Sequence, residues 1–225
     1  MPGLFITFEG GEGSGKTTQV MALVVYLRST GREVVATRDP GGTPIGKLIR
    51  TLLLDRDHTQ MAPTAELLLY QASRAQLMHE VIRPALAADR IVLCDRFTDS
   101  TVAYQGYGRK LDLDLIVRLN TLATGGLRPD LTLLLDLDPI LGLARATQRG
   151  AERQERQDRI EREVLAFHQH VRTGYQCIAA ADPGRVTVLD ASAGPAEIAG
   201  RIRGRVEEML LAAGRATGSG IPAAG

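Results

Sequence analysis

The sequence predicts an α/β fold, a five-stranded parallel sheet with helices on both faces. Three observations support it: five short apolar segments, helical patterns between them, and a glycine-rich turn that joins the first apolar segment to the first helical one. Alternation of strand-like and helix-like segments is typical of parallel sheets, because each strand needs a long crossover before the next can pair with it. The 225 residues suffice for one well-buried domain.

The predicted elements follow from hydrophobic periodicity. Apolar, strand-like segments occur at 4–8, 33–37, 91–94, 131–137 and 186–189. Helices, with apolar residues at three- and four-residue spacing, are predicted at 18–28, 48–54, 66–86, 113–123, 140–148, 160–180 and 196–211. We expect one domain over residues 1–211. From residue 212 the chain reads AAGRATGSGIPAAG, which lacks the apolar content for packing, so a disordered tail is predicted over 212–225.

The glycine-rich turn matches the pattern G-x-x-x-x-G-K-[ST] and predicts a phosphate-binding loop, or P-loop. It consists of Gly10, Gly11, Glu12, Gly13, Ser14, Gly15, Lys16 and Thr17, with Thr18 directly after it. A polyphosphate must be wrapped by backbone N–H groups, and glycine lets the chain approach that closely. We expect Lys16 to reach the β- and γ-phosphates of ATP and the Thr17 hydroxyl to coordinate Mg²⁺.

Composition argues against several classes of protein. Lys and Arg number 27 against 26 acidic residues, so the chain has no general basic field and we expect no nucleic-acid partner. Cys94 and Cys177 lie far apart without metal-type spacing, and both are expected to be reduced and structural. Because no long apolar segment or signal-like start is present, we expect no membrane partner and a cytoplasmic location.

Charged residues follow four of the five predicted strands directly. They are the phosphate loop, Arg38-Asp39-Pro40-Gly41-Gly42-Thr43, Asp95-Arg96-Phe97 and Asp136-Leu137-Asp138-Pro139. In open parallel sheets, ligands bind beyond the carboxyl ends of the strands. We therefore expect a charged site at one edge of the sheet.

Taken together, the motifs resemble the thymidylate kinase family, which phosphorylates dTMP with ATP. They read FEGGEGSGKTT, RDPGGT, YQASRAQL, DRFTDSTVAYQG, RPDLTLLLDLDP and DRIE, and the resemblance covers residues 4–195. It implies a P-loop NTPase fold, transfer of the ATP γ-phosphate to dTMP to give dTDP, and Mg²⁺ as cofactor. A homodimer is implied by the resemblance alone.

A kinase of this kind must bring two anions together. The acceptor phosphate has a second pKa of about 6, so at neutral pH it is mostly a dianion and already a competent nucleophile. No general base is required. Positive charge and in-line positioning are required instead, so arginines should dominate the site.

The resemblance assigns the acceptor phosphate to Arg96. Asp95 is expected to orient Arg96 or a metal-bound water, although capping of the next segment is an alternative. Arg38 either assists at the phosphates or forms an ion pair with Asp39 or Glu12. Glu12 cannot stabilise a transferring phosphoryl group, and the resemblance makes it an acceptor for the sugar 3′-hydroxyl.

Base recognition is predicted around Tyr70 and Arg74, which lie four residues apart on one helix face. By resemblance, Tyr70 stacks on thymine and Arg74 donates to its O4 carbonyl. A core tyrosine and a solvated partner of Glu66 are the alternative roles. The resemblance implies further substrate contacts by Asp39, Pro40, Ser100, Thr101, Tyr104 and Gln105. Thr101 would face the N3 edge, and Tyr104 would exclude a ribose 2′-hydroxyl unless it serves only in helix packing.

Residues 149–163 carry five arginines interspersed with five acids. This segment resembles the family's lid, predicted at about 149–160, which closes over ATP. Arg153, or else Arg149, Arg156 or Arg159, would act as an arginine finger, an effect of about 10³- to 10⁵-fold in related transfers. A solvent-exposed charged helix is the alternative for any single arginine.

Two positions depart from the family pattern, and two other functions stay open. The family commonly has Glu at the position of Asp39 and Tyr or His at that of Phe97. A kinase for dUMP, dCMP or a deoxynucleoside is one alternative, although a guanidinium donor suits a 4-keto pyrimidine. A nucleotide-binding switch or regulatory ATPase is the other, but it would have little use for a second pocket lined by Tyr70, Arg74 and Arg96.

Overall fold

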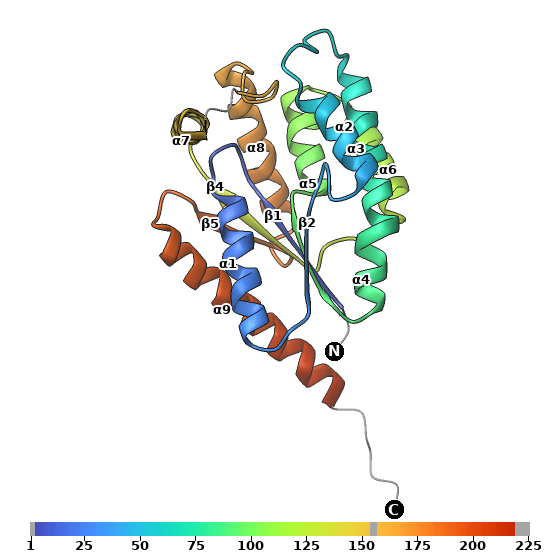
Figure 1. Ribbon diagram of the computed structural model, residues 1–225, viewed down its shortest axis with the longest axis vertical. Helices are drawn as coiled ribbons and strands as arrows, with labels where there is room; N and C mark the ends of the chain where they lie inside the picture. The colour runs from blue at the N-terminus through green and yellow to red at the C-terminus, as the bar shows by residue number, and fades with distance from the viewer. Residues whose placement is uncertain (1–2, 154–156, 219–225) are drawn as a thin grey trace, which may run out of the picture.

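The computed structural model describes residues 3–153 and 157–218, and strands and helices alternate along them (Figure 1). The strands are β1 (Leu4–Glu9), β2 (Val34–Arg38), β3 (Ile91–Asp95), β4 (Leu131–Asp136) and β5 (Val186–Asp190). They form one sheet in the order β2-β3-β1-β4-β5, and every neighbouring pair is parallel. The predicted five-stranded parallel sheet is confirmed.

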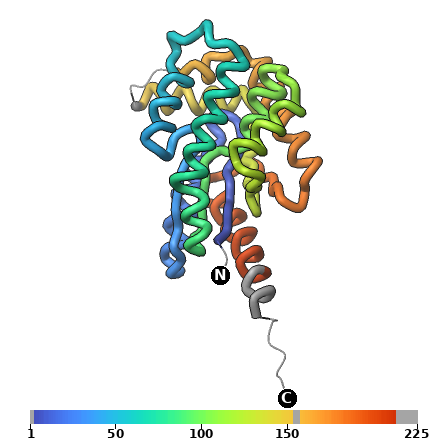
Figure 2. The backbone as a smooth tube through the Cα atoms, turned by 90° about the vertical axis from the view of Figure 1, so that its right-hand side faces the viewer, coloured from blue at the N-terminus to red at the C-terminus, as the bar shows by residue number. Residues whose placement is uncertain are grey.

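Helices cover both faces of this sheet (Figures 1 and 2). They are α1 (Lys16–Ser29), α2 (Pro44–Leu54), α3 (Pro63–Leu77), α4 (Arg83–Ala87), α5 (Thr98–Thr101), α6 (Leu113–Thr124), α7 (Pro139–Arg153), α8 (Leu165–Ala181) and α9 (Pro195–Gly218), with π-helical segments η1 (Met78–Ile82) and η2 (Val102–Gly108). α1 and α9 pack on one face, and α4 and α8 pack on the other. Within the described residues, no helix is both long and apolar enough to cross a membrane.

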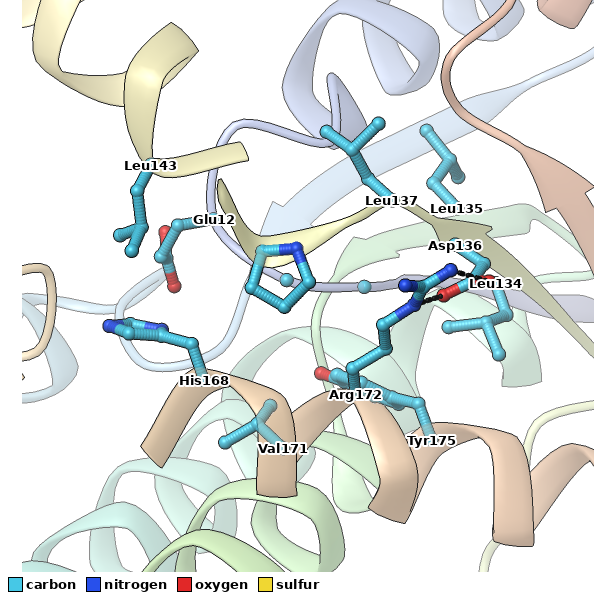
Figure 3. A pocket seen from close by; sticks show the side chains of 13 residues that line it. Glu12, Leu134, Leu135, Asp136, Leu137, Leu143, His168, Val171, Arg172 and Tyr175 are labelled. Atoms are coloured by element: carbon cyan, nitrogen blue, oxygen red, sulfur yellow. Dashed lines mark hydrogen bonds and ion pairs between the residues drawn. The ribbon is translucent and has the colours of Figure 1, made fainter. Parts of the chain in front are cut away.

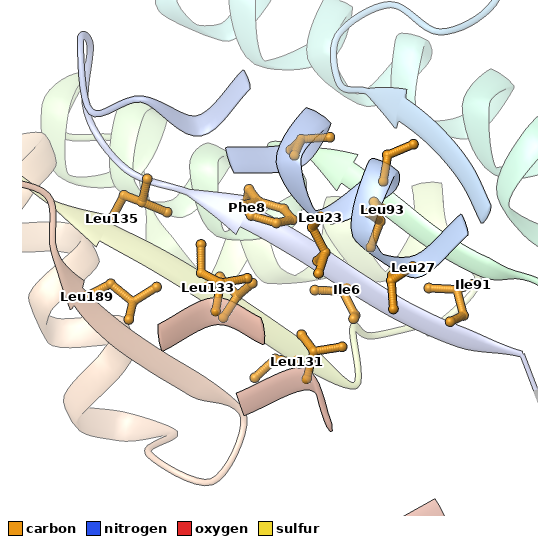
Figure 4. Close-up of a cluster of buried hydrophobic side chains, with 14 of the residues drawn as sticks. Ile6, Phe8, Leu23, Leu27, Ile91, Leu93, Leu131, Leu133, Leu135 and Leu189 are labelled. Atoms are coloured by element: carbon orange, nitrogen blue, oxygen red, sulfur yellow. The ribbon is translucent and has the colours of Figure 1, made fainter. Parts of the chain in front are cut away.

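Alternate strand residues point to opposite faces, so each face has its own apolar cluster. Ile6 and Leu93 pack with Leu23 and Leu27 of α1 (Figure 4). Their neighbours Phe5, Val92 and Cys94 pack with η1 and α4 on the other side. Burial on both faces explains why the strands are nearly continuous apolar runs. The sheet is thus a rigid support for the residues that follow each strand.

The predicted continuous helix over 66–86 is instead α3, η1 and α4. Pro84 has no N–H, and its ring would clash with the carbonyl four residues earlier in a regular helix. The helix widens to a π-helical turn before Pro84, where the Arg83 N–H donates to the Met78 carbonyl five residues earlier. α5 and η2, over 98–108, were not predicted, because TDSTVAYQGYG lacks a clear apolar period of 3.6.

Several predicted helix boundaries were wrong: α2 begins at Pro44 instead of 48 and α3 at Pro63 instead of 66, and three larger differences follow. α7 continues to Arg153 instead of ending at Gln148. α8 begins at Leu165 and not at residue 160, because the Asp158 carboxylate accepts the N–H groups of Ile160 and Glu161 and forms a turn there. α9 continues to Gly218 instead of ending at residue 211, so helix is found over 212–218 where the sequence predicted a disordered tail; alanine, which occurs three times in this segment, has the highest helix propensity. Residues 219–225 lie outside the described residues.

Candidate active site

The phosphate loop joins β1 to α1 at the carboxyl edge of the sheet. Gly13 and Gly15 have φ values of 67° and 88°, which favour glycine. A Cβ on Gly13 would lie 2.0 Å from the carbonyl oxygen of Gly142 in α7. The loop therefore requires glycine both for its turn and for the close backbone approach of α7.

Lys16 begins α1, and its side chain folds back over the loop. Its Nζ donates to the carbonyl oxygens of Gly10 and Gly11, at 3.1 and 2.7 Å. Burial lowers the pKa of Lys16 to about 8, helped by the charge of Arg96 and opposed by that of Glu12. At neutral pH the ammonium is still mostly charged, so a positive group lies inside the loop.

A solvent-open cleft, with about 1890 Å³ of empty space including open solvent, lies at the loop, and we call it the donor cavity. Thr17, Thr18, Arg38, Arg50, Asp95, Arg96, Arg149, Asp158 and Glu161 line it together with loop residues 12–16. The Thr17 hydroxyl donates to the Asp95 carboxylate at 2.8 Å. Among the described residues, no group of three or more His, Cys, Asp or Glu could hold a metal ion. A hydroxyl beside one carboxylate suits Mg²⁺, which keeps several waters and takes few protein ligands.

A second cavity of about 510 Å³, the acceptor cavity, adjoins the first. All ten predicted substrate residues line it: Glu12, Asp39, Pro40, Tyr70, Arg74, Arg96, Ser100, Thr101, Tyr104 and Gln105. The two cavities share Glu12, Asp39, Arg50, Arg96 and Asp158. Residues that follow β1, β2 and β3 thus meet Arg50 of α2 and Asp158 at one boundary between two compartments.

Arg96 lies at this boundary in a left-handed backbone conformation, with φ of 69°. Its Nη2 donates to Glu12 Oε1 at 2.7 Å and its Nη1 to the Gly10 carbonyl at 3.0 Å. The guanidinium also lies over the ring of Tyr104, 4.9 Å from its centroid. The guanidinium of Arg96, which we predicted to bind the acceptor phosphate, lies between the two cavities.

Glu12 shares its Oε1 between Arg96 and the Tyr104 hydroxyl, which donates at 2.8 Å. Burial alone would raise the pKa of Glu12, but the charges of Arg96 and Lys16 outweigh it and lower the pKa to about 2. The carboxylate therefore stays ionised, and it accepts hydrogen bonds in the cavity that it shares with Tyr104.

Arg74 is buried, with 1 % of its surface exposed. Its Nε donates to Asp39 at 2.6 Å; the other N–H acceptors are Gln71 Oε1, Asn120 Oδ1, the Phe97 carbonyl and the Thr101 hydroxyl. These bonds occupy all five N–H donors of the guanidinium. A direct contact of Arg74 with a base carbonyl would require one of them to be exchanged or shared. The alternative role as a solvated partner of Glu66 is wrong.

Within the part of the chain that it describes, the structure shows neither of the two ion pairs considered for Arg38. Asp39 pairs with Arg74 and Glu12 pairs with Arg96, both in preference to Arg38. Arg38 instead lines the donor cavity. Near it, Arg50 of α2 donates to the Pro40 carbonyl at 3.2 Å and lines both cavities. Burial lowers the pKa of Arg50, as do the charges of Arg38 and Arg96.

The predicted lid arginines have different surroundings. Arg149 lines the donor cavity and donates to Glu161 Oε1 at 3.4 Å. Arg159 is buried away from it: its Nε donates to the Leu53 carbonyl, and its Nη2 forms an ion pair with Glu66 at 2.6 Å. The side chain of Arg153 and the whole of Arg156 lie outside the described residues.

Sequence reasoning missed Arg50, Asp158 and Ile160 in the cavity lining, and Glu9 and Tyr175 beneath Arg96. Arg50 lies in an amphipathic helix and Asp158 in a mixed-charge segment, so neither stands out by pattern. Glu9 offered one signal, since it is an acid that directly follows the apolar run of β1.

A third cavity of about 370 Å³ lies beside the phosphate loop, lined by Gly10, Gly11 and Glu12 on one side and by α8 on another (Figure 3). Arg172 of α8 grips Asp136 at the end of β4 through two hydrogen bonds of 2.8 and 2.9 Å. The planar fork of arginine matches a carboxylate in this way. α8 is thereby fastened to the sheet next to the loop.

Comparisons with known proteins agree with this geometry. The family model described as Thymidylate kinase matches residues 8–202. The thymidylate kinase of Geobacter sulfurreducens is 57% identical over 193 residues, which are 85% of this chain and 91% of that protein. That of Synechococcus sp. (strain JA-2-3B'a(2-13)) is 55% identical over 207 residues, 92% and 96% of the two chains. The crystal structure of thymidylate kinase from Ehrlichia chaffeensis superposes with a TM-score of 0.69 at 37% identity, covering 84% of this chain and 93% of that one.

Proposed function

This chain belongs to the thymidylate kinase family, and we propose that its acceptor cavity holds dTMP while its donor cavity holds ATP. Thymidylate kinases are nucleoside monophosphate kinases with the P-loop NTPase fold, and the chain phosphorylates dTMP to dTDP with ATP. The observation that carries the assignment of the cavities is their shared boundary at Glu12, Arg50 and Arg96. Reacting phosphates must meet in line at such a boundary.

In the proposed mechanism, a phosphate oxygen of dTMP attacks the γ-phosphorus of ATP. The bond to the β–γ bridging oxygen breaks, that oxygen leaves on ADP, and the product is dTDP. No proton need be removed, since the dTMP phosphate is mostly a dianion at neutral pH. The chain contributes charge and position: Lys16 at the β- and γ-phosphates and Arg96 at the acceptor phosphate.

The acceptor side follows from the cavity lining. Tyr70 stacks on thymine, and Thr101 and Arg74 meet its polar edge, with Arg74 exchanging or sharing one of its protein hydrogen bonds. Tyr104 lies against the sugar and excludes a 2′-hydroxyl, while Glu12 accepts from the 3′-hydroxyl. Support comes from the presence of all these side chains in one cavity of about 510 Å³.

Mg²⁺ is the proposed cofactor, with the Thr17 hydroxyl as protein ligand and Asp95 as acceptor for metal-bound water. Their 2.8 Å contact at the donor cavity supports this pairing. When bound, the ion would neutralise charge on the β- and γ-phosphates. We also propose that residues 1–211 act as one kinase domain with the lid at about 149–160, and that Arg153, with Arg149 beside it in α7, supplies the arginine finger.

Activity of the purified protein tests the acceptor assignment. ADP formation from Mg·ATP should depend strongly on dTMP, less on dUMP, and little on dCMP or dGMP, with the phosphorylated product identified by mass. A 4-keto pyrimidine suits the donors around Thr101, whereas a 4-amino group does not. Preference for another monophosphate would overturn the base pocket, and hydrolysis that ignores added acceptor would indicate an ATPase.

We propose a homodimer built on α2, α3 and α6, in a cytoplasmic protein. α2 packs against α3 and α3 against α6 (Figure 2). All three helices expose large apolar side chains. These are Ile45, Leu48, Leu52, Leu68, Leu113, Leu115, Val117 and Leu122. An apolar surface of this extent is typical of an interface between protein chains.

Light scattering after size exclusion should give twice the mass of one chain. Leu48→Glu places a charge in the proposed interface and should shift the protein to the mass of a monomer. Leu211→Glu on α9 is the matched control, because Leu211 is 63% exposed and Leu48 70%. A wild-type monomer, or a Leu48→Glu dimer, would contradict the proposed interface.

A further inference from the structure

Glu9 is a buried carboxylate that the mechanism above does not use. It ends β1, directly before the phosphate loop, with none of its surface exposed. Its Oε1 accepts from the backbone N–H groups of Phe97 and Ser100, at 2.8 and 3.3 Å. Its Oε2 accepts from the Ser100 hydroxyl at 2.5 Å and the Tyr175 hydroxyl at 2.9 Å. Three of these four donors belong to the segment that carries Arg96.

The backbone of Arg96 needs such support. A positive φ is uncommon for a residue other than glycine and persists only where the surroundings hold it. Two hydrogen bonds to β1 hold the backbone before and after the Cα of Arg96. The Arg96 N–H donates to the Phe8 carbonyl at 2.9 Å, and the next N–H, of Phe97, donates to Glu9. Neighbouring residues of one strand thus hold consecutive N–H groups.

The same carboxylate acts on the Arg96 side chain through two hydroxyls. Arg96 Nη1 donates to the hydroxyl oxygens of Ser100 and Tyr175, at 3.4 and 3.3 Å. Both hydroxyls also lie within hydrogen-bond distance of Glu9 Oε2. On the far side, Glu12 binds Nη2. The guanidinium is therefore held between an ionised carboxylate at the cavity boundary and a buried carboxylate–hydroxyl cluster below it.

We propose that Glu9 is a positioning residue for phosphoryl transfer, which holds Arg96 at the boundary of the two cavities through Phe97, Ser100 and Tyr175. The inference rests on the acceptor role proposed above for Arg96. Glu9 touches neither cavity, so its effect on the reaction passes through the position and charge balance of Arg96.

The protonation state of Glu9 also affects how firmly it holds Arg96. Burial raises the pKa of Glu9 to about 7, and the charge of Asp99 raises it further, while the Ser100 hydrogen bond and Arg96 oppose the shift. The ionisable groups that face Glu9 are Asp99 of α5, Arg96, Lys16 of α1, Cys94 of β3 and Tyr175 of α8. As the pH falls through about 7, Glu9 takes up a proton and its hold on Arg96 weakens.

Glu9→Gln keeps the size of the side chain and removes its charge. We expect kcat to fall about 10- to 100-fold, as for a small misplacement of a group at the reacting atoms, with KM for ATP unchanged. In the pH profile of kcat, the part of the decrease toward low pH that comes from protonation of Glu9, near pH 7, should disappear. A limb with a pKa of about 6 from the dTMP phosphate should remain in both proteins.

Two further variants separate positioning from a structural effect. Thr7→Val removes another buried hydrogen bond of β1, the 2.8 Å contact with Thr132, and should leave kcat and its pH profile unchanged. In an Arg96→Lys background, Glu9→Gln should cost little more, because the residue through which it acts is already altered. Wild-type kcat in Glu9→Gln, or equal losses in the two backgrounds, would overturn the proposal.

Different outcomes would contradict the acceptor role of Arg96 and the positioning role of Glu9. Wild-type activity in Arg96→Lys would contradict the acceptor role of Arg96, whereas an impaired Arg96→Lys beside a fully active Glu9→Gln would contradict only the role of Glu9. If Glu9→Gln does not fold, Tyr175→Phe removes a single hydroxyl from the cluster. It should lower kcat several-fold with KM for ATP unchanged, and an unchanged kcat would overturn the proposal as well.

Discussion

Arg96→Ala should lower kcat/KM for dTMP by about 10³-fold or more. The variant lacks the planar guanidinium that lies between the cavities proposed for two mutually repelling phosphates. Lys16 lies too deep in the loop to replace it. The loss has a second part. Glu12, whose pKa is lowered to about 2 with Arg96 present, would keep a carboxylate beside the phosphates without its ion-pair partner.

Initial rates over a matrix of dTMP and ATP concentrations measure this effect, with KM for ATP expected to change least. Arg128→Ala is a suitable control, since Arg128 is 70% exposed and pairs only with Asp182 among the described residues. Its kinetics should match those of the wild type. Survival of dTMP affinity and turnover in Arg96→Ala would remove the acceptor assignment and, with it, the basis for a role of Glu9.

Asp39→Asn should destabilise the fold by about 3 kcal/mol, because it leaves the buried charge of Arg74 without its ion-pair partner. The two side chains are 0% and 1% exposed, and they lie 2.6 Å apart. Arg74 cannot turn to water, since its other donors bind α5, α6 and the Phe97 carbonyl in the interior. For a chain of this length, the loss corresponds to a fall of about 10 °C in Tm.

Urea unfolding and thermal melts of the purified variant test this expectation. Glu197→Gln is the control: its pair with Arg201 on α9 is more than half exposed at both ends, and such pairs contribute about 0–1 kcal/mol. A loss below about 1 kcal/mol in Asp39→Asn would mean that neighbouring polar groups, and not Asp39, compensate the guanidinium.

The sequence by itself determined the sheet, the phosphate loop and ten of the fourteen residues that line the acceptor cavity. The hydrophobic pattern of a strand or helix can be recognised within the segment itself, because each apolar residue must fall on a face that the core covers. The strands at 4–8 and 91–94 can therefore be predicted without knowing which elements pack against them. The phosphate loop is local too, since its glycines serve the turn itself. Parallel strands bring their carboxyl ends to one edge, which is why the residues after them meet.

Only the tertiary structure decided how these side chains are partnered. Arg74 finds acceptors on three segments outside its own helix, and Glu9 binds residues about 90 and 166 positions away, distances at which no sequence period operates. Arg159 looks like any other arginine of the mixed-charge segment, yet burial against Glu66 removes it from the donor cavity. A buried polar group must be satisfied by whatever the fold places beside it, and that choice is made by packing between distant elements.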